Sequence, residues 1–255
     1  SGGARYCAIS GIELYGHEEG DSSLDTTLKS VYNVPGTQQL EVYYDAKETS
    51  SYPESGVTVT DISPNTNNGT LNGGVGFDST YKAFTFDGVD DYIDGTITTG
   101  TGAWSHTVAF WVKIDEFNGA PFFIIDPSAD GADPTASTAP HLFANTDGTL
   151  NYAFWSNAGN FLDDNGNQLI AQKGVWQHYV VQYDASTGGT NYTDRKLIIN
   201  GNQTYYPAAG TATALNMSAS NNLHIGGRFH SSASTFFDGS IANFRLFSKA
   251  LNADQ

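Results

Sequence analysis

The sequence predicts an all-β protein, a two-sheet antiparallel jelly-roll sandwich, from three observations. Short apolar runs recur along the chain, and Gly, Asn, Asp or Pro bounds each of them. Ten or more of these runs show the two-residue alternation of half-buried strands, with no helical period between them. The composition agrees, because 28 glycines and 8 prolines in 255 residues suit short strands joined by turns.

The expected strands lie between residues 40 and 247. They are Leu40–Tyr44, Ala83–Phe86, Tyr92–Ile93, Thr107–Ile114, Phe122–Ile125, Leu150–Trp155, Trp176–Tyr183, Lys196–Ile199, Gln203–Tyr206, Leu223–Ile225 and Ile241–Phe247. The pair Asn200-Gly201 predicts a tight hairpin between two of these strands, because both central residues of a type I′ turn need a positive φ.

Alternation also predicts which side chains face the core. In the strand around Trp111, one face carries Val108, Phe110, Val112 and Ile114. Burial of each large apolar side chain contributes roughly 1.5–3 kcal/mol, so this face must point inward. The same alternation leaves Trp111 on the opposite, mixed polar face of its strand. It also leaves Trp155 on the mixed polar face of the strand that contains it. A second layer or a ligand must cover an indole there, because exposure in water brings no gain.

The charge of the chain excludes two classes of partner. Eleven basic residues against 27 acidic ones give a net charge of -16, which repels nucleic-acid phosphates and anionic lipid surfaces. No run approaches 18 apolar residues, so we expect no membrane insertion. The single cysteine, Cys7, cannot form an internal disulfide, so the fold must depend on packing, with or without a metal.

Two parts are expected along the chain. Residues 1–39 are interpreted as a strand and linker remnant of a preceding module, and residues 40–255 as one jelly-roll domain. The strand at residues 5–16 resembles the closing strand of discoidin-like modules; the alternative is an extra edge strand of the main domain. Because the chain begins Ser-Gly-Gly without Met, we expect it to be a piece of a longer polypeptide.

Five phrases, in order, carry a resemblance to a known family. They are FDGVDDYI, HTVAFWVKI, GVWQHYVVQYD, KLIINGNQ and FDGSIANFRLFSKALNADQ. Together they resemble the laminin-G-like and pentraxin-like modules of the concanavalin A-like lectin/glucanase superfamily, over about residues 40–255. With the segment Tyr43–Val75, the chain is also similar to modules in surface and fibre proteins of phages and large algal DNA viruses. That likeness implies an extracellular or virion-surface location.

The hydrolases of this superfamily carry paired carboxylates on one strand, and glycoside hydrolysis needs such a pair roughly 5–9 Å apart. No pair of Glu residues follows Glu54. Asp90-Asp91 and Asp163-Asp164 are adjacent in sequence, so on a strand their side chains would point to opposite faces. The six histidines form no recognisable cluster, and His178 is expected to have a packing role. We therefore expect a protein that is not an enzyme.

The resemblance implies a structural Ca²⁺ held by carboxylate and carbonyl oxygens, which a hard cation prefers. The candidate ligands are Asp61, Asn65, Asp87, Asp90 and Asp238, with Asn68 beside them. An acid that the family carries in the last phrase has no counterpart, because Ala242 stands there. The alternative is that these Asp and Asn residues form turns.

A glycan site is expected at two long polar loops. Sugars are bound by aromatic faces together with planar polar groups, and long loops in a compact domain are usually functional or mobile. Residues 126–141 and 156–168 flank the strand that carries Trp155, which we take as the stacking platform. The expected ligand contacts are Asp126, His141, Asn157, Asp163, Asp164, Arg228 and His230. Individually, each of these could equally be a solvated loop residue.

The sequence thus predicts a non-catalytic, lectin-like recognition module of a larger surface, virion or fibre protein, which mediates glycan attachment. Its partners would be glycans and neighbouring domains of the same polypeptide or virion. The alternative is a structural or assembly domain that binds no sugar. In that case Trp104, Tyr205 and Tyr206 would be exposed and form an interface.

Overall fold

The computed structural model describes residues 39–128, 132–155, 159–208, 213–229 and 234–251. Residues 37–250 form one compact unit. Strands dominate it, and η3 (Tyr192–Asp194) is a short 3₁₀ helix among them. The all-β prediction is confirmed, whereas the strand expected at residues 5–16 lies outside the described residues.

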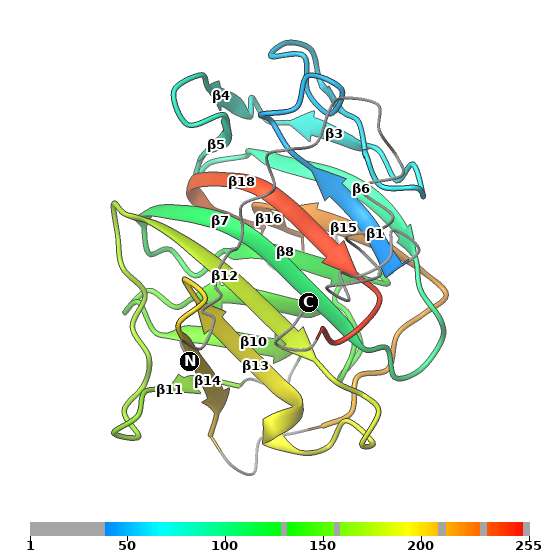
Figure 1. Ribbon diagram of the computed structural model, residues 1–255, viewed down its shortest axis with the longest axis vertical. Coiled ribbons are helices and arrows are strands. Elements are labelled where there is room, and N and C mark those ends of the chain that lie inside the picture. Colours follow the sequence, from blue (N-terminus) through cyan, green and yellow to red (C-terminus); the bar gives the residue numbers. More distant parts are fainter. Residues whose placement is uncertain (1–38, 129–131, 156–158, 209–212, 230–233, 252–255) are drawn as a thin grey trace, which may run out of the picture. The chain divides into compact units, whose positions relative to one another are not determined.

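The larger sheet has nine strands and faces the viewer in Figure 1. Its order is β11-β14-β13-β12-β7-β18-β5-β4, and β1 also pairs with β18. The bounds are β1 Leu40–Tyr44, β4 Gly76–Asp78, β5 Ala83–Asp87, β7 His106–Glu116, β11 Phe161–Leu162, β12 Trp176–Tyr183, β13 Arg195–Ile199, β14 Gln203–Pro207 and β18 Asp238–Phe247.

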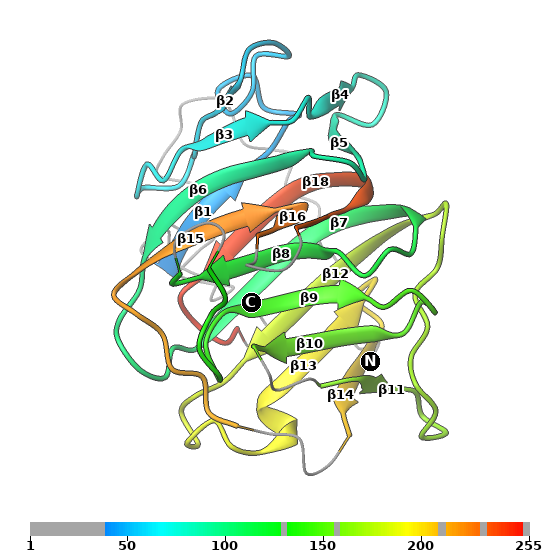
Figure 2. The same cartoon turned by 180° about the vertical axis from the view of Figure 1, so that it is seen from behind.

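The second sheet has seven strands and is seen from its own side in Figure 2. Its order is β10-β9-β8-β15-β6-β3-β2. The bounds are β2 Thr58–Val59, β3 Gly69–Asn72, β6 Tyr92–Thr98, β8 Pro121–Asp126, β9 Pro140–Ala144, β10 Leu150–Phe154 and β15 Ser220–Ile225. All pairings within both sheets are antiparallel, as expected of the sandwich.

The core lies between the two sheets. The face of β7 that was predicted to point inward does so, since Val108, Phe110, Val112 and Ile114 are at most 1% exposed. The Phe110 ring has Phe123 of the facing sheet 6.0 Å away, near the middle of this layer. Edge-to-face ring pairs of this kind add to the free energy that burial alone supplies.

A small third layer lies over part of the outer face of the seven-stranded sheet, whereas Thr96 and Thr98 of β6 on that face are exposed. A small hairpin, β16 (Gly227–Arg228) with β17 (Thr235–Phe236), follows the last strand of that sheet in sequence. The Phe229 ring lies 4.6 Å from Tyr92 and 5.1 Å from His224, which belong to β6 and β15. Every residue of β8 and β10 is buried, and beside β10 the Asn151 side chain hydrogen-bonds to Gly159 and Asn160.

The outer face of the nine-stranded sheet keeps an alternating pattern. Trp111 on β7 is 43% exposed while its neighbours on either side in sequence are buried. Next to it, β18 has a bulge between Ala242 and Arg245. The predicted hairpin is confirmed, because Asn200 and Gly201 have φ values of 55° and 69°. This open face therefore offers side chains that a ligand can reach.

Candidate functional site

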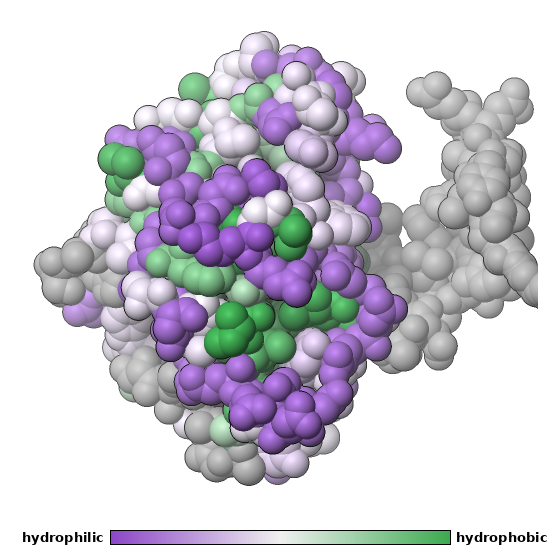
Figure 3. Space-filling model, turned by 90° about the vertical axis from the view of Figure 1, so that its left-hand side faces the viewer, coloured by the Kyte–Doolittle hydropathy of each residue, from purple (hydrophilic) through white to green (hydrophobic). Residues whose placement is uncertain are grey.

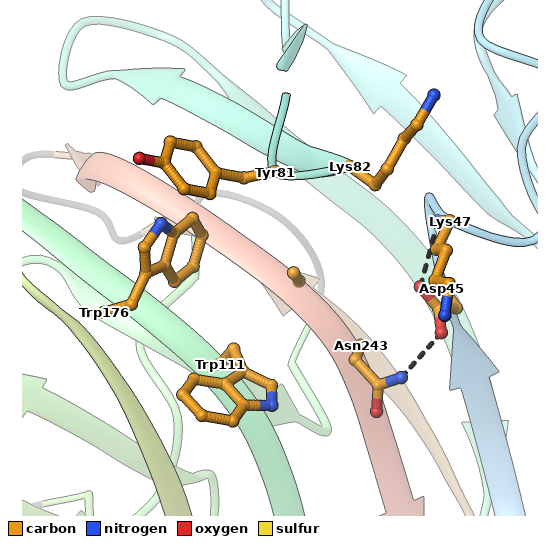
Figure 4. Close-up of a pocket in the computed structure, with 8 residues that line it drawn as sticks. Asp45, Lys47, Tyr81, Lys82, Trp111, Trp176 and Asn243 are labelled. Atoms are coloured by element: carbon orange, nitrogen blue, oxygen red, sulfur yellow. Dashed lines mark hydrogen bonds between the residues drawn. The ribbon is translucent and has the colours of Figure 1, made fainter. Parts of the chain in front are cut away.

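A pocket on the open face of the nine-stranded sheet combines aromatic and polar side chains (Figure 4). Its cavity volume is about 330 Å³, which is within the range of small-molecule sites. Below it is called the Trp111 pocket. The residues that line it are Asp45, Lys47, Tyr81, Lys82, Trp111, Trp176, Ala242 and Asn243.

The aromatic wall comes from two neighbouring strands and a turn. Antiparallel pairing of β7 with β12 places Trp111 opposite His178, and Trp176 follows two residues away on the same face. On its other side Trp111 is opposite Ala242 of β18, whose methyl group leaves the indole uncovered. The result is a broad indole surface in the middle of a sheet, with 43% of Trp111 open to solvent.

Tyr81 completes this wall from the turn between β4 and β5. The Asp78 carboxylate accepts hydrogen bonds from the backbone N–H groups of Thr80 and Tyr81, at 2.7 and 3.1 Å, which holds the turn in place. The Tyr81 ring lies 5.7 Å from the Trp176 ring and is 59% exposed. A tyrosine this exposed above a tryptophan gives a ligand a second flat surface to contact.

The polar wall is built around Asn243, which sits in the β18 bulge with a φ of 51°. A bulge of this kind re-aims a side chain, and a positive φ is uncommon for a residue other than glycine. The Asn243 amide donates to Asp45 Oδ2 at 2.6 Å, and Asp45 also accepts from the backbone N–H of Lys47 and from Tyr43. With its amino group held in this way, the carbonyl oxygen of Asn243 has no protein donor among the described residues.

Two lysines stand at the rim of the Trp111 pocket (Figure 4). Lys82 pairs with Glu54 at 2.5 Å, whereas Lys47 has no ion-pair partner in the described ranges. Beside the aromatic wall, burial and the nearby charge of Arg245 lower the pKa of His178 below its ordinary value. His178 is therefore neutral at pH 7, and the positive charges of this face include Arg245 and Lys113, which lies opposite Trp176.

This arrangement suits binding better than bond cleavage. It offers flat rings, an amide carbonyl and ammonium donors, which together match a molecule with apolar faces and many hydroxyls. Among the described residues, Asp45 is the single carboxylate that lines the pocket, and it is 4% exposed and already hydrogen-bonded. General acid–base hydrolysis of a glycoside needs two carboxyl groups facing the substrate.

The structure brings together part of the site that was predicted from sequence. The Arg228 guanidinium lies 5.7 Å from the Trp155 ring, and the His141 ring lies 6.1 Å from it. His141 and Asp126 are only 3% and 5% exposed, however, and burial lowers the pKa of Arg228. The predicted platform Trp155 is therefore half-buried against Arg228 and His141. Asn157 and His230 fall outside the described residues.

Asp163 and Asp164 lie in a different place, called here the Tyr206 pocket. Its cavity volume is about 320 Å³, and its lining includes Tyr192, Tyr205 and Tyr206. Asp163 accepts from the backbone N–H groups of Asn165 and Asn167, both at 2.9 Å, and these bonds lower its pKa. Asp164 accepts from the Gln203 side chain at 2.5 Å. The two aspartates are thus separate from Trp155 and adjoin exposed tyrosines instead.

Figure 3 shows hydrophobic patches surrounded by hydrophilic residues on the side of the molecule that is at the left in Figure 1. No helix among the described residues is long and apolar enough to cross a membrane.

A family model described as the concanavalin A-like lectin/glucanases superfamily matches residues 87–255. The chain belongs to this superfamily. The family prediction made from the five phrases is confirmed at that level.

Solved structures agree with this superfamily fold. A Trypanosoma rangeli sialidase in complex with sialic acid matches with a TM-score of 0.56 and 15% identity, covering 91% of this chain and 36% of that one. The binding domain of botulinum neurotoxin serotype D/C matches with a TM-score of 0.53 and 13% identity, covering 85% and 50%. The chain therefore spans about a third of the sialidase chain. None of the curated proteins compared with the chain matches it.

The calcium that we expected of a superfamily member has a different set of candidate ligands from the one predicted. Carboxylate oxygens of Asp87, Asp90 and Asp91 lie within 4.8 Å of one another. Asp91 is 4% exposed, and its Oδ1 is buried without a hydrogen-bond partner in the described part of the chain, while its Oδ2 accepts from the N–H of Asp87. An orphaned buried carboxylate oxygen beside two more carboxylates fits a hard cation.

Charge repulsion around this cluster extends to β18. Burial raises the pKa of Asp91, and the charges of Asp87 and Asp90 raise it further. Asp238 lies across from Asp87 and Glu116 on the neighbouring strands; burial and adjacent acids, including these two, raise its pKa. Such a group of acids would gain from a bound divalent cation.

Asp61 and Asn65 have other roles. The Asp61 carboxylate accepts from the backbone N–H groups of Tyr43, Ser63 and Asn67 and from the Ser63 hydroxyl, at 2.7–2.9 Å. Its oxygens therefore fix a loop. The Asn65 amide donates to the backbone of Leu40 and to Glu41. Asp61 and Asn65 thus behave as the turn-forming residues of the alternative interpretation. Asp91, which the sequence analysis did not include among the metal ligands, belongs to the carboxylate cluster.

Two aromatic residues named for the assembly alternative are less exposed than expected. Trp104 is 9% exposed and stacks on His106 at 4.9 Å, so it belongs to the core. Tyr205 is half-buried against the core, and Tyr206 is 36% exposed.

His178 packs as expected, with its ring 5.2 Å from Trp111.

Proposed function

We propose that the chain is a non-catalytic carbohydrate-binding module whose sugar ligand stacks on Trp111. One observation carries the proposal: an indole 43% exposed at the centre of a sheet lies in a pocket beside an Asn side chain that a buried carboxylate holds in place. A ligand that covers the indole removes its apolar area from water, and the Asn243 carbonyl accepts from a hydroxyl.

The chemistry of a sugar ring matches both walls of the Trp111 pocket. One face of a pyranose presents C–H groups, which pack on an aromatic ring, while its edge carries hydroxyls for amide and ammonium groups. Asp45 supports this recognition indirectly, because its carboxylate fixes the orientation of the Asn243 amide at 2.6 Å. Pre-organised polar groups of this kind lower the entropy lost on binding.

The sialidase and toxin matches agree with the fold, and at 13–15% identity they bear on the fold alone. The glycan function rests on the Trp111 pocket. Attachment as part of a larger surface, virion or fibre protein, and an extracellular location, stay predictions drawn from the resemblance in sequence.

The test compares two tryptophans in the same domain. Wild type, Trp111→Ala and Trp155→Ala are run by affinity electrophoresis through gels that contain xylan, mixed-linkage β-glucan, galactomannan, laminarin or alginate. We expect retention of the wild type by at least one polysaccharide, and a loss of about 30-fold or more in affinity for Trp111→Ala, as for removal of a binding hot spot. Trp155→Ala, folded to the same degree by circular dichroism, should be retained like the wild type.

Other outcomes identify other sites. If Trp155→Ala abolishes retention and Trp111→Ala does not, the ligand binds at the site expected from sequence, and the Trp111 pocket is excluded. If no polysaccharide retains the wild type and a glycan array is also blank, the carbohydrate proposal fails and the assembly alternative gains support.

We propose in addition that Asp87, Asp90 and Asp91 hold a Ca²⁺ ion with a structural role. The support is the orphaned Oδ1 of Asp91 together with three carboxylates within 4.8 Å. A bound ion would neutralise this group and tie the segment after β5 to the start of β6. Removal of the ion by a chelator should then lower the melting temperature without a loss of the sugar site itself.

A further inference from the structure

The exposed aromatic side chains are distributed unevenly over the described residues. Those that are at least 36% exposed are Tyr81, Trp111, Tyr192 and Tyr206. Tyr81 and Trp111 line the Trp111 pocket, and Tyr192 and Tyr206 line the Tyr206 pocket. Exposed aromatics are therefore confined, in this part of the chain, to two pairs.

The strand register places one member of each pair, Trp111 and Tyr206, on one face of the nine-stranded sheet. Ala109, two residues from Trp111 on β7, pairs with Val180 of β12. Val180 pairs with Ile198 of β13, and Ile198 pairs with Thr204 of β14. Directly paired residues share a face, and so do residues two apart on a strand. Tyr206, two residues beyond Thr204, thus points to the same side as Trp111.

The register also gives the separation of the two pairs. Tyr206 lies three strands away from Trp111 and four residues along the strand direction. At ~4.8 Å between strands and ~3.4 Å per residue, each displacement is ~14 Å, which gives a diagonal of ~20 Å. The side chains on the diagonal between them include Val180 and Ile198, which are half-buried and apolar.

The Tyr206 pocket has the same mixture of groups as the Trp111 pocket. Tyr192 and Tyr206 supply rings, and Asp164 supplies a carboxylate that accepts from Gln203. Gln203 is itself held at its other end, because its Oε1 accepts from the Tyr205 hydroxyl at 2.8 Å. Flat rings next to hydrogen-bonded planar groups are again what a sugar ring requires.

We propose that the ligand is an extended chain of several linked sugar rings that contacts the Trp111 pocket and the Tyr206 pocket together. This inference rests on the proposed function. One sugar ring cannot span ~20 Å, so a monosaccharide or a short oligosaccharide fills a single pocket. A linear polysaccharide reaches both, and the second contact then forms at a high effective concentration.

The experiment measures affinity against chain length. The polysaccharide that retains the wild type best is hydrolysed to a ladder from disaccharide to octasaccharide, and each fraction is titrated by calorimetry into wild type, Trp111→Ala and Tyr206→Ala. Wild-type affinity should rise steeply, by about tenfold or more, at the length that reaches the Tyr206 pocket. Tyr206→Ala should remove this rise, while Trp111→Ala should weaken binding at every length.

Two matched variants serve as controls. Tyr206→Phe retains the ring and should keep most of the rise, which separates stacking from loss of the hydroxyl. Val57→Ala shortens a side chain that is 63% exposed elsewhere and should behave as wild type throughout. Circular dichroism of each variant confirms that the fold is retained.

The two proposals fail in different ways. If affinity reaches its maximum with short fractions, or if Tyr206→Ala matches wild type on the octasaccharide while Trp111→Ala loses binding, the extended-chain inference is overturned and the proposed function stands. If Trp111→Ala and Tyr206→Ala both match wild type on every fraction, neither pocket binds the sugar and both proposals are overturned. If no polysaccharide retains the wild type, the function itself is overturned.

Discussion

The Asp91→Asn substitution should have opposite effects on stability with and without calcium. In the calcium-free protein, Asp91 places a buried charge within 4.8 Å of two other carboxylates. At that separation a pair of unit charges repels by about 1 kcal/mol in water and about 3 kcal/mol at an effective dielectric constant of 20. Because Asp87 and Asp90 are exposed, the lower part of this range applies. An amide at position 91 keeps an oxygen that can accept from the N–H of Asp87.

We therefore expect Asp91→Asn to stabilise the calcium-free protein by about 1–2 kcal/mol at low salt, or about 2–8 °C in melting temperature. In wild type, calcium at about 100 times its dissociation constant adds ~2.7 kcal/mol by linkage, and Asp91→Asn should lose most of that gain. Urea unfolding in EGTA and in calcium measures both effects. Glu48→Gln, which removes one exposed charge elsewhere, controls for the net charge.

A pH series gives an independent check of the sign. In the folded, calcium-free protein, the pKa of Asp91 is raised above its ordinary value of 3.8. The folded state therefore takes up a proton at a higher pH than the unfolded chain does. As pH falls through the raised pKa toward 3.8, this proton uptake increases the stability of the fold. Calcium binding lowers the pKa of its ligands, and this gain should disappear. Destabilisation by Asp91→Asn in EGTA, or an equal calcium response in variant and wild type, would refute the reasoning.

Three further predictions concern the core and the polar wall. Phe110→Ala should destabilise the fold by about 3–5 kcal/mol in urea, because this side chain is fully buried between the sheets. Burial lowers the pKa of His106 to about 4, so the neutral ring is favoured in the folded state. The free energy of unfolding should therefore fall as pH decreases from 6.5 to 4, and His106→Gln should flatten that part of the stability profile. Asn243→Gly and Asn243→Ala should both lower sugar affinity, and the glycine variant should lose less stability, because both lose the hydrogen bond to Asp45 and glycine also accepts the φ of 51°.

Much of the fold was predictable from local pattern. Long strands with β-branched and aromatic residues, such as β7 and β12, were found with bounds within one or two residues. The missed strands carry a weaker pattern. β9 contains Pro140 and His141 and is buried except for the half-buried Phe143, and β3 begins at Gly69, whose space is restricted by Val59 and Ile93. Packing from distant segments, which alternation does not record, forms these strands.

The candidate site was less predictable because strand register assembles it. Alternation did identify Trp111 as an indole on the outer face. That Trp176 and Ala242 flank it follows from pairing with β12 and β18, which are far away in sequence. Asn243 reaches the pocket through a bulge, and one extra residue in a strand changes the face of every side chain after it. Tyr81 depends on a turn held by Asp78.

Trp111 and Trp155 satisfy the same sequence pattern, and a distant turn decides between them. At Gly226 the chain leaves the seven-stranded sheet with a φ of 82°, and a Cβ there would lie 2.5 Å from the Phe86 ring. After this turn, the β16–β17 hairpin lies over part of the outer face of the sheet, and Arg228 packs near Trp155. The described residues place no such layer over Trp111. Trp111 contacts His178 and still leaves 43% of its surface exposed, whereas Trp155 is half-buried, so Trp111 is the indole that a ligand can cover.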